Sequence, residues 1–262
     1  MKTKLILCDL DGTLLRSDKT ISQKSASVLE QCRRSGILIG FSTSRGRGNV
    51  VPYETQIQPD VLICNGGASV VYKNKQIFTA EFTLEETRKI LKTAYEVCGD
   101  NTEITLDLID KMYWNRSFDK STDYDKTAIY DDFRDFKIPA MKICVQTTDK
   151  EKASKIASCV QGCDMLPFSD IPWFKFSPKI ATKENAISFL CDYLKIDPNE
   201  IIAFGDDHND IGMLRMCGRG VAMENAIDEV KAVCDFVTKS NNDDGVANFL
   251  EENLSFSENA SL

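Results

Sequence analysis

Four short runs of consecutive apolar residues limit the folds open to this chain more than any other feature. They are "KLILCDL" (4–10), "ILIGFST" (37–43), "DVLICNGG" (60–67) and "EIIAFGDD" (200–207). Continuous apolar strands are typical of parallel sheets that helices cover on both faces. Helical patterns lie between them: 22–36 has Ser22 as its expected N-cap and Gly36 at its end, and 182–194 is another. The sequence therefore predicts an α/β fold.

The middle of the chain has a different pattern. A length of 262 residues is long for a single hydrophobic core. A helix over 83–98 opens this middle part, and shorter alternating strand patterns and a second helix follow it. We expect a discontinuous core of residues 1–82 and 183–262, interrupted by an inserted α+β domain over 83–182.

Charge and composition exclude several classes of function. The net charge of −8 argues against nucleic acid or an anionic membrane as a partner. The ten cysteines occur singly without a C-x-x-C pair, as expected for reduced thiols in the cytoplasm, and one histidine leaves little for zinc sites or Ser-His-Asp triads. From the apolar runs, we expect neither a signal peptide nor a membrane-spanning helix. We expect a soluble cytoplasmic protein, and its oligomeric state stays open.

Polar clusters follow each of the four apolar runs. They are Asp9 with Asp11, Thr43–Arg45, Asn65–Gly67 and Asp206–Asp210. Alone, each cluster has a structural explanation as an acidic turn, a plain turn or a helix cap, although the first has its glycine too early for a calcium loop. Ligands of a parallel sheet bind beyond the carboxyl ends of its strands, so four clusters at one edge together indicate a binding site.

Several carboxylates in one crevice repel one another unless a cation lies between them. All-oxygen ligands favour a hard ion, and Mg²⁺ suits a site that also binds phosphate. A lysine upstream of the last apolar run would add positive charge. Lys183 is the preferred candidate and Lys179 the alternative. Carboxylates, a cation, a lysine and backbone N–H groups together indicate a phosphate site.

The segments "DLDGTLL", "FSTSR", a lysine and "GDDHND", in this order, resemble the four motifs of the haloacid dehalogenase superfamily. The closing stretch "GVAMENAIDEVKAVCDFVT" resembles its Cof-type branch. The resemblance covers the core, while the middle agrees in position and size only. It implies a Rossmann-like core with an inserted cap that selects substrates. It also implies a Mg²⁺-dependent phosphatase for small phosphorylated metabolites, sugar phosphates above all.

The resemblance assigns catalytic roles to four acids. Asp9 would be the nucleophile that takes the phosphoryl group as an aspartyl-phosphate. Asp11 would protonate the leaving alcohol and then deprotonate water. The Asp9 carboxylate, the Asp11 carbonyl and Asp206 would bind Mg²⁺, and Asp210 would support this metal site.

Five further residues would bind phosphate or neutralise charge. Thr43 and the backbone of Ser44 would hold phosphate oxygens, and the Leu10 N–H would assist them. Lys183 would neutralise charge on the nucleophile and on the transferring group. Asn209 would touch the phosphate.

The chain departs from the family pattern at three positions. Ser44 replaces the glycine of the usual T-G-R motif, Glu184 replaces the glycine after the lysine, and His208 is expected to be an exposed loop residue. Five residues could line a closed substrate pocket or simply pack between domains: Arg45, Arg47, Trp114, Arg116 and Trp173.

Two other functions stay open at this point. A phosphotransferase or phosphomutase would use the same aspartyl-phosphate but pass the group to a sugar hydroxyl. A non-catalytic module would only bind phosphorylated metabolites. The presence of both Asp9 and Asp11 weighs against the second alternative.

Overall fold

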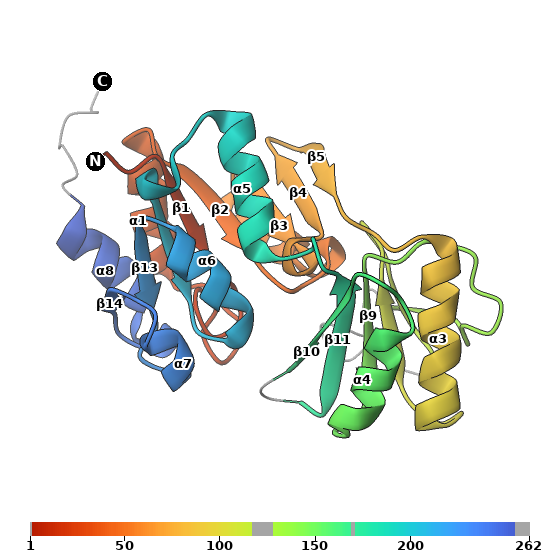
Figure 1. Cartoon of the computed structure of the whole chain (residues 1–262). Helices are drawn as coiled ribbons and strands as arrows, with labels where there is room; N and C mark the ends of the chain where they lie inside the picture. The colour runs from red at the N-terminus through yellow and green to blue at the C-terminus, as the bar shows by residue number, and fades with distance from the viewer. Residues whose placement is uncertain (1, 117–127, 169–170, 255–262) are drawn as a thin grey trace. The chain divides into compact units, whose positions relative to one another are not determined.

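The structure, a computed structural model, describes residues 2–116, 128–168 and 171–254. It divides into two compact units (Figure 1). The first comprises Met1–Ser44, Pro52–Phe78 and Thr182–Leu262, and the second comprises Arg45–Val51 and Thr79–Ala181. The sequence-based boundaries lie within a few residues of 78/79 and 181/182. The sequence-based boundaries placed Arg45–Val51 in the core, whereas the structure groups this segment with the second unit. A loop between a strand and a helix carries no sequence signal for the unit to which it belongs.

The first unit contains a sheet in the order β14-β13-β12-β1-β2-β3-β4-β5. Its strands are β1 (Leu5–Cys8), β2 (Leu38–Ser42), β3 (Val61–Cys64), β4 (Ser69–Tyr72), β5 (Lys75–Thr79), β12 (Ile201–Gly205), β13 (Arg219–Ala222) and β14 (Phe236–Val237). The strands from β14 to β3 are parallel, and β4 pairs antiparallel with β3. The four apolar runs form β1, β2, β3 and β12, so the predicted α/β fold is confirmed.

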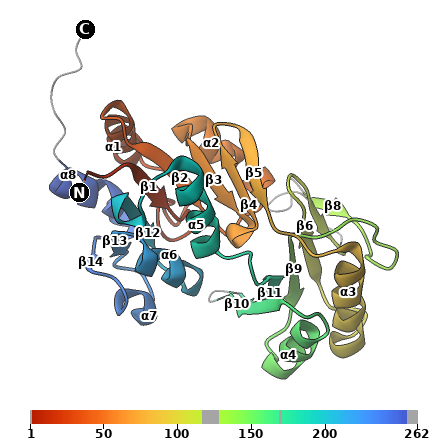
Figure 2. The ribbon, with the colours of Figure 1, turned by 45° about the horizontal axis from the view of Figure 1, so that its top comes forward.

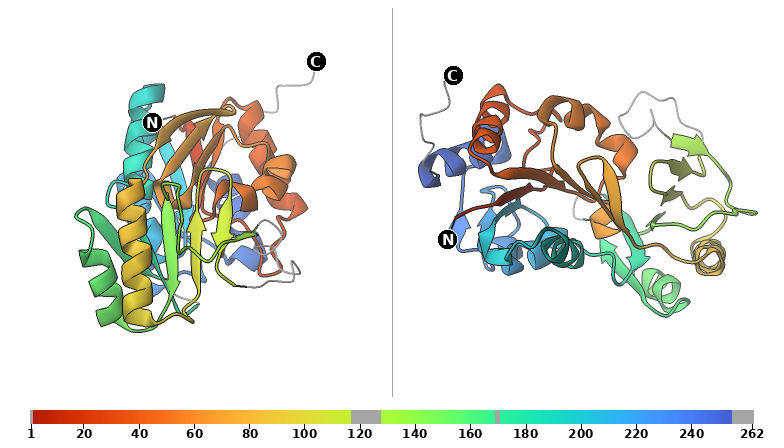
Figure 3. Two further views of the ribbon diagram at one scale, coloured as in Figure 1. Left: turned by 90° about the vertical axis from the view of Figure 1, so that its right-hand side faces the viewer. Right: turned by 90° about the horizontal axis from the view of Figure 1, so that it is seen from above.

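Helices cover both faces of this sheet: α1 and α8 on one side, α5 and α6 on the other (Figure 3). The helices are α1 (Gln23–Arg34), α2 (Val51–Ile57), α5 (Lys183–Leu194), α6 (Ile211–Met216), α7 (Asp228–Lys231) and α8 (Gly245–Asn253). Single 3₁₀ turns occur at Arg47–Asn49, Asn65–Gly67, Pro198–Glu200, His208–Asp210 and Asn241–Asp243. Ser22 caps α1 as expected, because its Oγ accepts the Ser25 N–H at 2.9 Å. Thr182 caps α5 in the same way, which makes Lys183 its first residue.

The second unit has a sheet in the order β10-β11-β9-β6-β7-β8, and α3 and α4 lie on one of its faces (Figure 2). The elements are α3 (Leu84–Cys98), β6 (Ile104–Asp107), β7 (Met112–Trp114), β8 (Ala128–Tyr130), β9 (Lys142–Gln146), α4 (Lys150–Ser158), β10 (Cys163–Pro167) and β11 (Trp173–Pro178). Its core joins buried residues of both helices to Ile104, Ile143, Val145 and Phe176. Among the described helices, none combines the length and the apolar character that a membrane crossing requires.

A buried ion pair lies on the sheet face of the second unit that α3 and α4 do not cover. Ile143 and Val145 point into the helix-packed core, so alternation along β9 directs Lys142 and Cys144 to the opposite face. Lys142 is the register partner of Asp107, and its Nζ lies 3.0 Å from Asp107 Oδ2. Both side chains are less than a tenth exposed. Each charge therefore replaces part of the hydration that the other has lost on burial.

Replacement of Asp107 by alanine should destabilise the second unit strongly, because it removes a carboxylate that lies 3.0 Å from the buried Lys142 ammonium. Loss of one partner of a buried pair costs about 3–5 kcal/mol. The matched control is Asp100→Ala, which removes an exposed pair with Arg134 at 3.0 Å and should cost less than about 1 kcal/mol. Urea unfolding of both variants measures the difference. Equal losses in the free energy of unfolding would show that the buried Lys142–Asp107 pair contributes no more to stability than an exposed pair.

Candidate active site

Lys183 joins three separate strand ends of the first unit. Its Nζ lies 2.7 Å from Asp9 Oδ1 and 2.6 Å from Asp210 Oδ1, and it also donates to the Ser42 carbonyl. The side chain is 1% exposed. Lys179, the alternative from the sequence, is exposed and belongs to the second unit. The structure thus brings Lys183, and not Lys179, to the carboxylate of Asp9.

The charge of Lys183 is held in place by its carboxylate partners. Burial by itself would lower the pKa of the ammonium group, but the carboxylates of Asp210 and Asp9 outweigh this effect and raise the pKa above its ordinary value. Lys183 therefore remains a cation at any pH at which the protein would function. A fixed positive charge beside Asp9 can stabilise negative charge that develops there during a reaction.

Three carboxylates form a cluster at the carboxyl ends of β1 and β12. Asp9, Asp206 and Asp210 each offer an oxygen, and these oxygens lie within 4.8 Å of one another. Thr13 Oγ1 donates to Asp206 Oδ1 at 2.6 Å and fixes that side chain. Gly12, with φ of 75°, lies against the same carboxylate, and any larger residue would collide with it. The close approach of these two segments requires glycine at this position.

Burial and mutual repulsion raise the pKa values of this cluster. Burial raises the pKa of Asp9 to about 7, with Asp210 adding to the effect and Lys183 opposing it. Burial, followed by the charges of Asp9 and Asp210, raises the pKa of Asp206 to about 9. A divalent cation would remove this repulsion, and an all-carboxylate donor set suits a hard ion. The residues present therefore fit a metal site.

Asp210 has a different position from the other two acids. Its Oδ1 accepts the Lys183 ammonium, and its Oδ2 accepts the backbone N–H groups of Asp206 at 2.9 Å and Asp207 at 3.2 Å. Both oxygens are thus engaged in shaping the loop after β12. His208, predicted to be an exposed loop residue, is partly exposed and begins the 3₁₀ turn His208–Asp210.

The residues predicted to bind phosphate lie at the same strand ends. Thr43 follows β2 and is 1% exposed; its N–H donates to the Ile63 carbonyl at 2.8 Å, and its carbonyl accepts the Gly66 N–H at 3.0 Å. Ser44 Oγ accepts Asn209 Nδ2 at 2.6 Å. Leu10 is fully buried in the turn after Asp9, where its carbonyl accepts the Leu15 N–H at 2.8 Å.

Asp11 is not a member of the acidic cluster, although its charge adds to the rise in the pKa of Asp9. The Asp11 carboxylate is not one of the three whose oxygens gather within 4.8 Å, and its Oδ1 accepts Lys19 Nζ at 2.7 Å. Sequence reasoning missed Lys19, Thr13 and Ser42. The hydroxyl of Thr13 lies within the "DGT" segment and could have been noticed, whereas a backbone carbonyl such as that of Ser42 has no sequence signal.

The residues proposed for a substrate pocket belong to the second unit. Trp114 and Trp173 meet edge to face with ring centroids 6.1 Å apart, and the Arg116 guanidinium lies 3.9 Å above the Trp114 ring. Arg45 is buried and donates to the Asn49 carbonyl at 3.3 Å. Arg45 and Arg47 lie in the Arg45–Val51 segment. The two tryptophans and Arg116 thus form one aromatic and cationic group.

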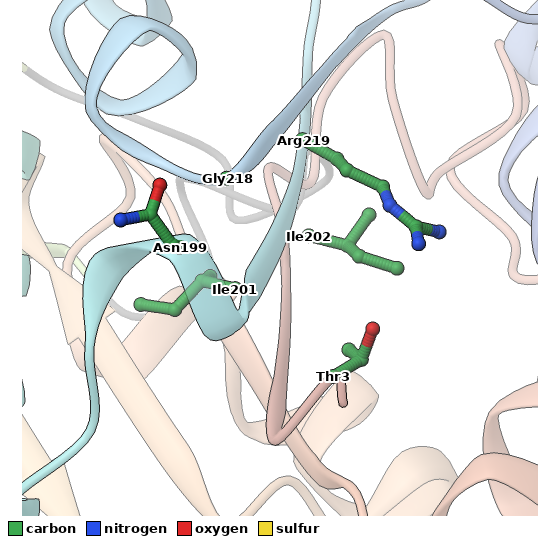
Figure 4. A pocket seen from close by; sticks show the side chains of 6 residues that line it. All are labelled: Thr3, Asn199, Ile201, Ile202, Gly218 and Arg219. Carbon is green, nitrogen blue, oxygen red and sulfur yellow. The ribbon is translucent and has the colours of Figure 1, made fainter. Parts of the chain in front are cut away.

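A pocket of about 210 Å³ lies in the first unit, at the opposite ends of the parallel strands from the acidic cluster (Figure 4). It is lined by Thr3, Asn199, Ile201, Ile202, Gly218 and Arg219. Ile201 and Arg219 begin β12 and β13, so this pocket faces the amino ends of the parallel strands. None of the predicted site residues lines it.

The order and geometry of these groups agree with a known family. The haloacid dehalogenase-like hydrolase family profile matches residues 6–250. The chain belongs to this family. The family relationship covers nearly the whole chain, including the second unit, for which the sequence motifs had given little information.

Relatives and solved structures extend over the same length. A protein of Bacillus subtilis named 5-amino-6-(5-phospho-D-ribitylamino)uracil phosphatase is 27% identical over 97% of the chain and 100% of the relative. A phosphoglycolate phosphatase of Methanopyrus kandleri is 26% identical over 96% of the chain and 97% of the relative. The crystal structure of a haloacid dehalogenase-like hydrolase from Bacteroides thetaiotaomicron has a TM-score of 0.83 at 25% identity, covering 97% and 100% of the two chains. The chain is thus a phosphatase of the haloacid dehalogenase type.

Replacement of Asp206 by asparagine should stabilise the metal-free protein, and more so at higher pH. Because the pKa of Asp206 is raised from 3.8 to about 9, its contribution to stability is complete below about pH 4 and is lost as the pH rises through 9. Asparagine removes this loss and can still accept from Thr13. In chelator, the gain of the variant over wild type should grow by roughly 1–3 kcal/mol from pH 5 to pH 8. Urea unfolding at both pH values measures it, and a constant difference would contradict the raised pKa of Asp206.

Proposed function

We propose that this phosphatase hydrolyses small phosphate monoesters, sugar phosphates above all, through a Mg²⁺-dependent reaction with an aspartyl-phosphate intermediate. The observation that carries the proposal is the buried contact of Lys183 with Asp9, directly beside the acidic cluster. The net charge of −8 supports a small-molecule substrate and neither nucleic acid nor a membrane as partner.

The first half of the reaction transfers the phosphoryl group to Asp9. An oxygen of the Asp9 carboxylate forms a bond to phosphorus while the bond from phosphorus to the ester oxygen breaks. Asp11 gives its proton to the departing oxygen, which leaves as an alcohol. Lys183, held by Asp210, balances the charge of the nucleophile. Thr43, the backbone of Ser44, the Leu10 N–H and Asn209 hold the non-bridging phosphate oxygens.

The second half regenerates the carboxylate. A water molecule attacks phosphorus, its proton passes to Asp11, and the bond from phosphorus to the Asp9 oxygen breaks. The products are the alcohol and inorganic phosphate, and Asp9 and Asp11 return to their starting protonation states. The presence of two acids on one turn thus follows from two tasks, nucleophilic attack and proton transfer.

Asp9, Asp206 and the Asp11 carbonyl would hold Mg²⁺, with Asp210 supporting them. When bound, the ion supplies positive charge that offsets the phosphate and allows a dianionic ester to approach a carboxylate. Without it, burial first and the neighbouring carboxylate charges second raise the pKa values of Asp9 and Asp206.

The second unit is the proposed source of substrate selection. The groups on the first unit recognise phosphate, which every substrate shares. The two relatives described above are named for different phosphate esters, so the shared fold does not dictate the alcohol. The group of Trp114, Trp173 and Arg116 offers aromatic and cationic contacts of the kind that bind a polar leaving group.

The experiment is phosphate release from a panel of sugar phosphates and other small esters, measured in Mg²⁺, in Ca²⁺ and in excess chelator. Mg²⁺ should support turnover, chelator should abolish it, and Ca²⁺ should support it poorly, because its longer and more variable bonds misplace the nucleophile. Asp9→Asn should lower the rate by at least about 10³-fold, since the amide is not a nucleophile. Exposed Asp192→Asn is the matched control.

Full activity in chelator would contradict the metal site, and substantial activity of Asp9→Asn would contradict the nucleophile. Addition of free sugars tests for transfer: a phosphorylated sugar product in place of inorganic phosphate would identify a phosphotransferase. Binding of esters without any turnover would identify a non-catalytic module.

A further inference from the structure

Lys19 pairs with the residue to which the proposed function assigns proton transfer. Its Nζ lies 2.7 Å from Asp11 Oδ1, and the two side chains are 46% and 36% exposed. Exposed ion pairs of this kind add only about 0–1 kcal/mol of stability. The contact between Lys19 and Asp11 therefore adds little to the stability of the fold.

A tight turn holds the backbone of Lys19. The Arg16 N–H donates to the Thr20 carbonyl at 2.9 Å, and the Lys19 N–H donates to the Arg16 carbonyl at 2.9 Å. Asp18 Oδ1 accepts both the N–H of Thr20 at 3.0 Å and its hydroxyl at 2.6 Å. Lys19 itself has a φ of 64°, a left-handed conformation that favours glycine or asparagine over lysine.

The segment between Asp11 and Lys19 is anchored to the rest of the first unit. Asn225 Nδ2 donates to the Gly12 carbonyl at 2.8 Å, and Asn241 Nδ2 donates to the Leu15 carbonyl at 2.8 Å. Arg16 forms an ion pair with Asp244 at 2.8 Å. These anchors fix the backbone on both sides of the pair, so the backbone positions from which Lys19 and Asp11 extend are well defined.

The chemistry of an ammonium group determines what this contact can do. A lysine ammonium donates hydrogen bonds and cannot accept them. The oxygen that faces it, Asp11 Oδ1, must therefore act as an acceptor. When Asp11 is protonated, its proton resides on the other oxygen, Oδ2, and the contact also restricts rotation of the carboxyl group.

We propose that Lys19 is a positioning residue for Asp11: it orients the carboxyl group and directs its transferable proton to Oδ2. The inference rests on the proposed function, in which the Asp11 proton passes to the ester oxygen as the bond to phosphorus breaks. Proton transfer of this kind requires hydrogen-bond geometry between the carboxyl group and the departing oxygen. Loss of Lys19 would leave the acid present but poorly oriented.

The test compares Lys19→Met with wild type on two esters, using kcat/KM because it reports the steps up to departure of the alcohol. One is the best alkyl phosphate from the ester panel, whose leaving oxygen needs a proton. The other is p-nitrophenyl phosphate, whose leaving group departs without one. Lys19→Met should lower kcat/KM for the alkyl ester by about tenfold or more and for p-nitrophenyl phosphate by less than about threefold. Lys19→Arg should restore the alkyl activity to within about threefold of wild type.

Lys195 provides the matched control. It is exposed, has a φ of 57° and lies at the end of α5 opposite to Lys183. Lys195→Met makes the same chemical change in the same backbone conformation, and it should change neither kcat/KM nor the midpoint of thermal unfolding. Lys19→Met should also leave that midpoint within a few degrees of wild type.

Equal losses on both esters, or no loss on either, would overturn the inference, as would a loss that accompanies unfolding of Lys19→Met. Asp11→Asn separates this outcome from failure of the proposed function. If Asp11→Asn retains wild-type kcat/KM for the alkyl ester, the assigned proton transfer itself is wrong. If Asp11→Asn loses this activity while Lys19→Met keeps it, only the role of Lys19 is wrong.

Discussion

The buried ammonium group of Lys183 is the interaction on which the site depends. It contacts the carboxylates of Asp9 and Asp210 and the carbonyl of Ser42, and so connects the ends of β1, β2 and the loop after β12. A lysine that is 1% exposed can remain charged only where carboxylates replace its lost hydration. Asp9 in turn needs that charge, because burial and the neighbouring carboxylates raise its pKa while Lys183 opposes them. The contacts of Lys183 thus hold the strand ends together and also determine the charges at the site.

Sheet topology explains why this network forms from distant parts of the sequence. β1 pairs in register with both β2 and β12. The residues that follow these strands must then emerge side by side at one edge. Two local features complete this arrangement. Gly12 allows the close approach to Asp206, and Thr182 caps α5, so that Lys183 is the first residue of this helix. The pocket at the amino ends of the strands is lined by none of these site residues.

Much of this could be read from the sequence, and the limits have physical causes. The apolar runs predicted the parallel strands because burial on both faces leaves a clear pattern. Of the predicted residues, Asp9, Asp206, Asp210 and Lys183 do meet in space, whereas the Asp11 carboxylate lies outside their cluster. The motif also led to Lys183 over Lys179. Contacts such as that of Lys19 with Asp11 could not be predicted, since they depend on one turn with a left-handed residue. Two further features could not be predicted either: the assignment of Arg45–Val51 to the second unit, and the buried pair of Lys142 and Asp107. Both depend on packing between residues that are distant in the sequence, and such packing leaves no periodic pattern.

The central claim is that Asp9 itself carries the phosphoryl group during turnover. The most direct measurement is to quench the enzyme with acid during steady-state turnover, reduce the acyl-phosphate with borohydride and map the peptides by mass spectrometry. Reduction converts a phosphorylated aspartate into homoserine, so the account predicts homoserine at position 9 only, and only when substrate was present. Homoserine at Asp11 or Asp206, or an unmodified Asp9 under conditions of rapid turnover, would contradict it.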